Sequence, residues 1–328
     1  MLAPRRSFIG ARKILVAIFV SLVCCGAVAQ AAMPANILIP GPMIFPESLT
    51  STPNGTLIIG SIGRHAIYRA VPASGVATPW ITAQSAGIHS IFGVLADMSS
   101  NTLWACSNIL ASPGARATAS ADLDAFDLKT GSLKAHYAFP SSGSLCNDIS
   151  ISRNGSVYAT DTNNMEVVRL RNGAKKIHVW AGKGAFGPRG SVLDGIVVLK
   201  RRVIVGTLAT NDLFSIPILA DGKSGRVTKI KLSHPLSHPD GIRPYSHNVL
   251  LIAEQGEPGR LLKLALRGNA AVVTTVKEGI PGDPDAVTVV NDTAYVLEGQ
   301  LNLLIEMMQG KPVQPRPFRA IAVRLHKR

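Results

Sequence analysis

The sequence predicts an all-β protein: a six-bladed β-propeller of four-stranded antiparallel blades. Three observations predict this fold: a unit that recurs six times, hairpin turns in nearly the same register, and β-branched runs with almost no helical periodicity. The units start about 45 to 54 residues apart, and a repeat of about 40 to 50 residues is typical of propeller blades. We therefore expect one propeller domain over residues 35–328.

Two units show the repeat most clearly. One starts at Glu47 and turns at Asn54-Gly55, and another starts at Asn147-Asp148 and turns at Asn154-Gly155. Asn-Gly between β-branched runs indicates a hairpin. The other four units start at Gly93, Asp194, Asp240 and Asp285.

The outer strands and the closure of the ring can also be placed. The expected outer strands cover residues 77–81, 133–139, 176–180, 227–232 and 271–276. Residues 37–39 and 318–325 are candidates to complete the last blade, because closing the ring removes its open edge.

The first 31 residues have the organisation of a secretory signal peptide. Four basic residues precede an apolar run over 14–28, and Ala29-Gln30-Ala31 follows. This order predicts a cleaved leader over 1–31 and a periplasmic or secreted mature protein. No later segment is apolar for long enough to span a bilayer, so we expect no transmembrane segment in the mature chain.

Two cysteines, Cys106 and Cys146, remain after cleavage. In an oxidising compartment two cysteines can pair if their Cα atoms come within about 7 Å. The sequence leaves open whether these two do so.

The chain is basic, with 34 Lys and Arg residues against 20 Asp and Glu residues and a formal charge of +14. The leader contributes four of these charges, which leaves about +10 for the mature chain. The basic residues are scattered, aromatic residues are few and no nucleic-acid-binding motif is present. We therefore expect a small-molecule substrate or ligand rather than nucleic acid, and the oligomeric state stays open.

Acidic residues recur where the innermost strands begin. In a propeller these strands converge on the central channel, and the six units place Glu47, Gly93, Asn147, Asp194, Asp240 and Asp285 there. Four carboxylates in one channel repel unless a cation compensates them, and an all-oxygen set suits Ca²⁺, Mg²⁺ or Mn²⁺. The alternative is that Asp and Asn only open tight turns, but their recurrence in register favours a metal site.

On these residues the chain resembles the senescence marker protein, gluconolactonase and luciferin-regenerating enzyme superfamily of six-bladed propellers. The resemblance spans nearly the whole mature chain and rests, in order, on Pro46-Glu47, Asn147-Asp148, Asp194-Gly195 and Pro239-Asp240-Gly241. It implies one divalent cation held by Glu47, Asn147, Asp194 and Asp240. Ca²⁺ is the first candidate, with Mg²⁺, Mn²⁺ and Zn²⁺ as alternatives.

The same resemblance implies metal-assisted hydrolysis of a lactone or related ester, gluconolactonase-like, with Asp240 as the catalytic base. Asp148, His238 and Asp285 are further candidates for the substrate pocket. Two positions depart from the family pattern. Asp194 stands where the family usually has Asn, and Leu145 stands where its lactonases carry an Arg that grips a sugar acid.

Two other functions are compatible with the sequence. One is a non-catalytic propeller that binds a small molecule or a protein at the channel mouth, since propellers host unrelated functions. The other follows the strictosidine synthase-like propellers, which the architecture also resembles but whose chemistry does not depend on a metal ring. The four oxygen-bearing positions argue against the second.

Overall fold

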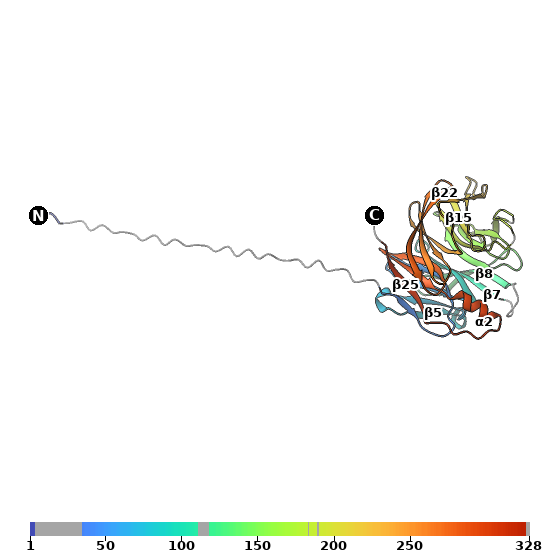
Figure 1. Cartoon of the computed structure of the whole chain (residues 1–328), viewed down its shortest axis with the longest axis horizontal. Coiled ribbons are helices and arrows are strands. Elements are labelled where there is room, and N and C mark those ends of the chain that lie inside the picture. The colour runs from blue at the N-terminus through green and yellow to red at the C-terminus, as the bar shows by residue number, and fades with distance from the viewer. Residues whose placement is uncertain (4–34, 111–117, 183, 189, 326–328) are drawn as a thin grey trace. The chain divides into compact units, whose positions relative to one another are not determined.

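The strands form six separate sheets, one for each predicted blade. The computed structural model describes residues 1–3, 35–110, 118–182, 184–188 and 190–325 (Figure 1). Apart from residues 1–3, the predicted signal peptide at 1–31 lies outside the described residues. The prediction of an all-β six-bladed propeller is confirmed.

Each of blades 1 to 3 has four antiparallel strands in chain order from the inside outward. Their strands are β2 (Pro46–Ser51), β3 (Leu57–Ser61), β4 (Ala66–Ala70) and β5 (Thr78–Thr82) in blade 1, β6 (Ser90–Asp97), β7 (Thr102–Leu110), β8 (Thr118–Asp127) and β9 (Leu133–Ala138) in blade 2, and β10 (Cys146–Ile151), β11 (Val157–Asp161), β12 (Glu166–Leu170) and β13 (Ile177–Ala181) in blade 3.

Blades 4 to 6 start from the inside in the same way but vary at the outer edge. Their strands are β14 (Leu193–Leu199), β15 (Arg202–Thr207), β16 (Asp212–Pro217) and β17 (Thr228–Lys229) in blade 4, β19 (Pro239–Ser246), β20 (Val249–Glu254), β21 (Gly259–Arg267), β22 (Ala270–Ile280) and β18 (Lys231–Leu232) in blade 5, and β23 (Pro284–Val290), β24 (Thr293–Glu298), β25 (Phe318–Arg324) and β1 (Ile37–Ile39) in blade 6.

Blade 6 closes the ring by joining the two ends of the domain. Strand β1 pairs antiparallel with β25, with Ile37 opposite Ala320 and Ile39 opposite Phe318. Both isoleucines are buried, so closure buries apolar surface as well as covering the edge of β25. The predicted pairing of the terminal segments is therefore correct.

The Asn-Gly turns fold as the sequence indicates. In blade 1 the Asn54 side-chain oxygen accepts a hydrogen bond from the Thr56 backbone N–H at 3.2 Å, and in blade 3 Asn154 does the same for Ser156 at 3.2 Å. Gly55 and Gly155 have φ values of 88° and 78°, a left-handed conformation that glycine adopts without a Cβ clash.

The expected outer strand over residues 227–232 is wrong in one respect, because it splits at Ile230. Strand β17 stays with blade 4, whereas β18 pairs in parallel with β22 of blade 5. Ile230 is 2% exposed and belongs to an apolar cluster between blades 4 and 5. Its backbone N–H donates to the Leu213 carbonyl of blade 4 at 2.7 Å, so the chain passes to blade 5 directly after this residue.

Three short helical segments interrupt the strands: η1 (Pro72–Ser74), α1 (Ala83–Ala86) and α2 (Leu301–Met308). The sequence pattern did not predict α2, which lies in the connection between β24 and β25. None of the helices in the described part of the chain is long and apolar enough to cross a membrane.

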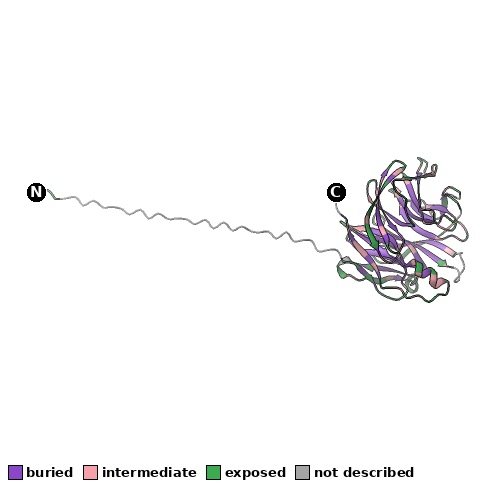
Figure 2. Ribbon diagram, in the orientation of Figure 1, coloured by how far each residue is buried: buried purple, intermediate pink, exposed green. Residues whose placement is uncertain are grey.

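Apolar side chains pack between neighbouring blades, and the strands are buried along most of their length (Figure 2). Aromatic pairs contribute to this packing. Tyr158 and Trp180 meet edge to face with ring centres 5.0 Å apart, and Phe186 and Phe214 do so at 5.8 Å. Such edge-to-face pairs are a favoured geometry for buried aromatic rings.

A disulfide joins blades 2 and 3. Cys106 on β7 and Cys146 on β10 are bonded, with their Cα atoms 5.2 Å apart and both side chains fully buried. The Asn108 amide binds both sides of the same backbone segment: it accepts from the Cys146 N–H at 3.0 Å and donates to the Cys146 carbonyl at 2.9 Å. The residue next to this link is Asn147.

Candidate metal centre

All six innermost strands carry a register shift at the same place. The shift lies between Pro46 and Ser48 in β2 and between Cys146 and Ile149 in β10, and the other four strands repeat it. The residue that follows the last pair before the shift therefore has an equivalent position in every blade. We call these six residues the ring: Glu47, Phe92, Asn147, Asp194, Asp240 and Asp285.

The register corrects one sequence assignment. Blade 2 contributes Phe92 to the ring, not Gly93, because Ile91 pairs with Ser107 in the way that Cys146 pairs with Asp161. The ring thus has four carboxyl groups, one amide and one half-buried aromatic side chain.

Glycine follows the ring residue in three blades because neighbouring backbones meet there. A Cβ added at Gly93 would overlap the Asn147 carbonyl oxygen, and one added at Gly195 would overlap that of Asp240. At Gly241 it would lie 2.7 Å from the Asp285 carbonyl oxygen. The Asp-Gly pairs seen in the sequence therefore bring successive inner strands close together.

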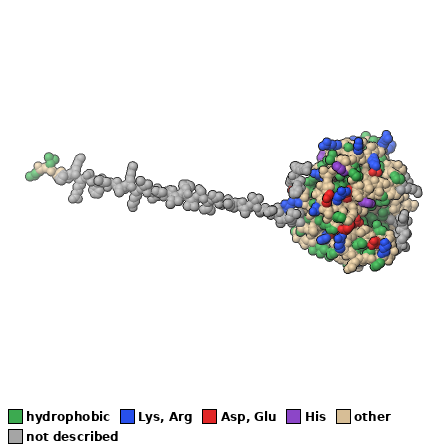
Figure 3. All heavy atoms as spheres, viewed as in Figure 1, with side chains coloured by type: hydrophobic (Ala, Val, Ile, Leu, Met, Phe, Trp, Pro, Cys, Tyr) green, Lys and Arg blue, Asp and Glu red, His purple; other side chains and the backbone are tan. Residues whose placement is uncertain are grey.

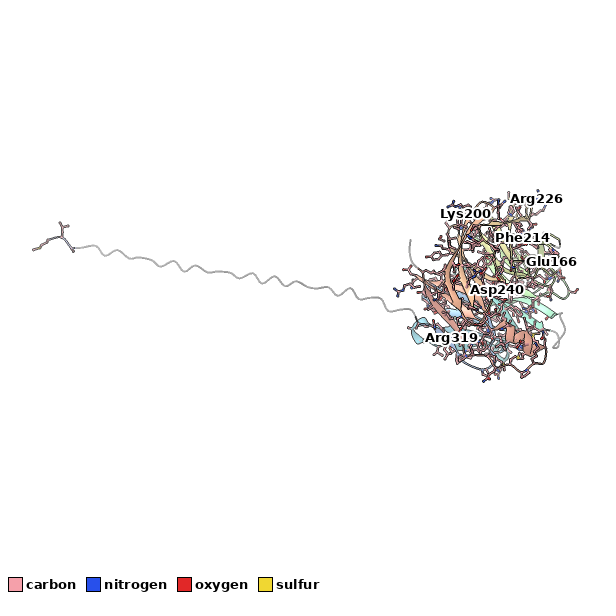
Figure 4. All side chains as sticks on the ribbon, viewed as in Figure 1. Glu166, Lys200, Phe214, Arg226, Asp240 and Arg319 are labelled. Atoms are coloured by element: carbon pink, nitrogen blue, oxygen red, sulfur yellow. A yellow bond between two sulfur atoms is a disulfide. The ribbon has the colours of Figure 1, made fainter. Side chains whose placement is uncertain are left out.

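The polar ring residues are buried. Glu47 and Asn147 are 6% exposed, Asp194 is 5%, Asp240 is 4% and Asp285 is fully buried. Asp240, labelled in Figure 4, accepts a hydrogen bond at 2.6 Å from the side chain of Gln255, which follows β20. The Asn147 amide donates to Asp194 at 3.4 Å. Side chains from different blades are thus in contact.

Several ring oxygens lack a partner. Asn147 Oδ1, Asp194 Oδ1 and both carboxyl oxygens of Asp285 are buried and have no hydrogen-bond partner among the described residues. Gly299 leaves the space for Asp285, because an added Cβ there would overlap its carboxyl group. Buried polar atoms are nearly always satisfied in folded proteins, and carboxylate and amide oxygens are the donor type that a hard divalent cation accepts.

The pKa values show how strongly the ring resists negative charge. Burial, then repulsion by Asp194 and Asp148, raises the pKa of Glu47 well above its ordinary value. Burial raises the pKa of Asp194 to about 7, and it acts with nearby carboxyl groups to raise the pKa of Asp240 and of Asp285. Burial and mutual repulsion therefore oppose ionisation of these four groups, and a bound cation would compensate their negative charge.

A buried ion pair lies beside the ring. The Arg243 guanidinium donates to both carboxyl oxygens of Asp148, at 2.8 and 3.0 Å, from side chains that are 9% and 7% exposed. Burial opposes the charge of Arg243, but Asp148 foremost, and then Glu47 and Asp240, raise its pKa. Asp148, a candidate for the substrate pocket, is therefore already held by a cation.

The ring is not a preformed cage. Among the described residues, no three His, Cys, Asp or Glu side chains come together closely enough to hold a metal ion. The structure does place all four predicted ligands, with Asp285, at equivalent ring positions. His238 is different: its side chain is exposed, and its backbone N–H donates to Asn211 at 2.6 Å.

Sequence reasoning missed Gln255, Arg243 and Phe92. Gln255 follows the second strand of its blade and Arg243 lies three residues after Asp240, so neither belongs to the recurring start of an inner strand. The strand register supplies the signal for Phe92.

On the face shown in Figure 3, Lys and Arg side chains are dispersed rather than gathered in one patch.

Comparison with solved structures supports the fold. The chain is similar to the major allergen Mala s 1 of Malassezia sympodialis, with a TM-score of 0.67 and 13% identity over 89% of this chain and 96% of that one. It is similar to a calcium-binding protein, regucalcin, from Agrobacterium tumefaciens, with a TM-score of 0.59 and 15% identity over 90% and 96% of the two chains.

A gluconolactonase of Xanthomonas campestris also shares the fold, with a TM-score of 0.55 and 13% identity over 82% of this chain and 85% of that one. No family model matches the sequence, and no curated protein matches it. At these identities the likeness shows the propeller fold, as the sequence resemblance led us to expect.

Proposed function

We propose that this protein is a metal-dependent hydrolase of a lactone or related ester, with the ring as its reaction centre. One observation carries the proposal: four buried carboxyl groups occupy equivalent positions at the start of the inner strands of four blades, and three of the ring side chains present unpartnered oxygens. The cationic Arg243 beside them is already bound by Asp148. The single charge of Arg243 is therefore shared with Asp148, and ionisation of all four ring carboxyl groups requires a further cation.

Glu47, Asn147, Asp194 and Asp240 would hold the metal, and Ca²⁺ is the first candidate because hard oxygen donors suit it. The regucalcin neighbour is a calcium-binding protein, and its likeness to this chain supports the same choice. When bound, such an ion polarises a carbonyl oxygen as a Lewis acid.

Asp240 is the proposed general base. Its pKa is raised by burial and by neighbouring carboxyl groups, which brings a carboxylate toward the basicity that proton abstraction near neutral pH requires. Gln255 holds one of its oxygens and so fixes the plane of the carboxyl group. Asp240 would take a proton from the attacking water at its other oxygen.

The substrate is proposed to be less polar than a sugar lactone. Leu145 stands at the position where the resemblance places an Arg for sugar-acid binding, and Phe92 makes one side of the ring apolar. Half-buried Leu301 and Met307 of α2 pack against the same apolar cluster as Phe92. An ester or lactone with an aliphatic or aryl group would suit these apolar side chains.

A panel of sugar, alkyl and aryl lactones tests the proposal with metal-loaded protein, chelated protein and an Asp240→Asn variant. We expect hydrolysis that stops with the chelator, returns with Ca²⁺, Mg²⁺, Mn²⁺ or Zn²⁺, and is absent from the variant. Hydrolysis that survives complete removal of metal would contradict the mechanism.

A non-catalytic binding propeller is the second candidate. It is favoured by the absence of a preformed three-residue cage in the described residues and by an aromatic side chain in the ring. Metal or ligand binding without turnover on any member of the panel would support this candidate against the hydrolase.

Export to the periplasm or beyond the cell is also proposed. It is supported by the leader pattern of residues 1–31 and by the disulfide between Cys106 and Cys146, since disulfides persist mainly in oxidising compartments. Fractionation of cells that express the full chain, with mass measurement of the mature N-terminus, tests it.

A further inference from the structure

Asp148 and Arg243 are exceptions at their positions in the repeat. Asp148 follows the ring residue of its blade, where the other five blades have small side chains: Ser48, Gly93, Gly195, Gly241 and Ala286. Arg243 lies three residues after its ring residue, where the other five blades have uncharged side chains: Thr50, Leu95, Ser150, Val197 and Thr288. Two blades thus carry matched, opposite charges in the layer next to the ring.

The pair reaches across the propeller. Asp148 belongs to blade 3 and Arg243 to blade 5, so their contact passes blade 4. Blade 4 takes part through its backbone, because the Ile196 N–H donates to the same Asp148 oxygen at 3.1 Å. Three donors therefore fix the orientation of the Asp148 carboxylate.

Arg243 is held but not saturated. Its Nη1 atom donates to Asp148 and also to the Ile242 carbonyl at 2.9 Å, whereas its Nε atom is buried without a partner among the described residues. A buried pair that served stability alone is often replaceable by apolar side chains. Arg243 shares β19 with Asp240, and its partner Asp148 directly follows Asn147, so the pair borders the ring and is placed to act on its charge.

We propose that Arg243 is a built-in counter-cation of the ring, positioned by Asp148, and that it limits the ring to one weakly held divalent cation. This inference rests on the proposed metal site. Arg243 opposes the binding of a second positive charge, and Asp148 moderates that opposition by drawing the guanidinium to itself. The two side chains therefore act on metal affinity with opposite signs.

The interactions of the ring support the opposite signs. Arg243 lowers the pKa of Glu47, whereas Asp148 raises the pKa of Glu47 and of Asp194. The charges of Arg243 and Asp148 thus have opposite effects on the pKa values of residues proposed to bind the metal.

Calorimetric titration with Ca²⁺ tests the proposal on Arg243→Met, Asp148→Asn and the double variant, each checked for folding by circular dichroism. Arg243→Met should bind Ca²⁺ at least about threefold more tightly, or bind a second ion, because a cation has been removed. Asp148→Asn should bind at least about threefold more weakly, because Arg243 is released toward the ring. The double variant should lie within about twofold of the parent.

A purely structural pair gives a different pattern. If both single variants bind Ca²⁺ more weakly, or if affinity follows melting temperature across the set, the counter-cation role is overturned. Arg202→Met is the matched control, with unchanged Ca²⁺ affinity expected, since it removes a partly buried Arg of β15 whose guanidinium donates to the Gly268 carbonyl at 2.7 Å.

Failure of the proposed function gives a separate result. If the parent binds no divalent cation, the metal site is contradicted, and melting temperatures of the metal-free proteins decide the role of the pair. Arg243→Met should lower the melting temperature, and adding Asp148→Asn should recover only part of the loss, because it removes the Asp148 charge and leaves the ring carboxyl groups without their cation. Full recovery would show that Arg243 compensates Asp148 alone and would overturn the counter-cation role without any metal measurement.

Discussion

A Cβ added at Gly195 would overlap the carbonyl oxygen of Asp240, so β14 and β19 approach each other closely beside two ring positions. Any larger side chain at residue 195 must separate these strands. Gly195→Ala should therefore reduce the free energy of unfolding by about 2–4 kcal/mol, as expected for overpacking at a closed backbone contact. Urea denaturation measures this change.

Gly182→Ala is the control for this prediction. A Cβ at Gly182 meets only the Val179 side chain at 3.8 Å, so stability should change by less than about 0.5 kcal/mol. Equal effects at the two positions would show that the contact between inner strands does not limit the choice of residue 195.

Metal-free protein should become less stable as pH rises from 5 to 8. Asp194 has a pKa of about 7 in the fold, above its ordinary value, so the folded state binds more protons than the unfolded state in this range. The stabilisation is present at low pH and is lost as pH rises through 7. Melting temperatures in the presence of a chelator measure it.

Two comparisons sharpen this pH prediction. Asp194→Asn should flatten the slope, and saturating Ca²⁺ should raise the melting temperature most at pH 8, where the carboxylates are ionised. A parent and variant with the same slope would contradict the assignment of the effect to Asp194.

Phe92→Ala should weaken the binding of apolar substrates. Loss of a half-buried aromatic face should raise KM for an aryl lactone by about tenfold and leave kcat and metal content nearly unchanged. An unsubstituted small lactone is the control substrate, since it lacks the aryl group that is proposed to contact Phe92. An equal loss on both substrates would mean that Phe92 supports the ring rather than selects the substrate.

Removing the disulfide should destabilise the propeller. Cys106 and Cys146 are 40 residues apart, and cross-linking a loop of that length is worth about 3–4 kcal/mol in the chain-entropy account. The Cys106→Ala/Cys146→Ala variant should lose about this much in urea denaturation. A reductant should then have no further effect on the variant, and a large further effect would point to another cause.

Much of this structure could be predicted from sequence. The blade repeat, the Asn-Gly turns and closure by residues 37–39 follow from local patterns that do not depend on distant contacts. The same repeat located Glu47 and Asp240, because equivalent positions in a closed ring converge.

Other features depend on contacts between blades. The sequence prediction for blade 2 was off by one residue, at Gly93 instead of Phe92, because a β-bulge changes the residue count within a strand. The glycine lies in the bulge, one residue after the ring position. Arg243 contacts Asp148 across 95 residues of sequence, and the chain changes blades after Ile230, whose side chain packs between blades 4 and 5. Contacts between residues so far apart in the sequence leave no local pattern from which to predict them.

Metal stoichiometry tests the central claim most directly. Purified parent and a Glu47→Gln/Asp240→Asn variant are dialysed against Ca²⁺, Mg²⁺, Mn²⁺ or Zn²⁺, confirmed as folded, and measured by elemental analysis. The account predicts one divalent ion per parent chain and none in the variant. A folded parent that retains no ion under any of these conditions would contradict the metal site and the hydrolase proposed on it.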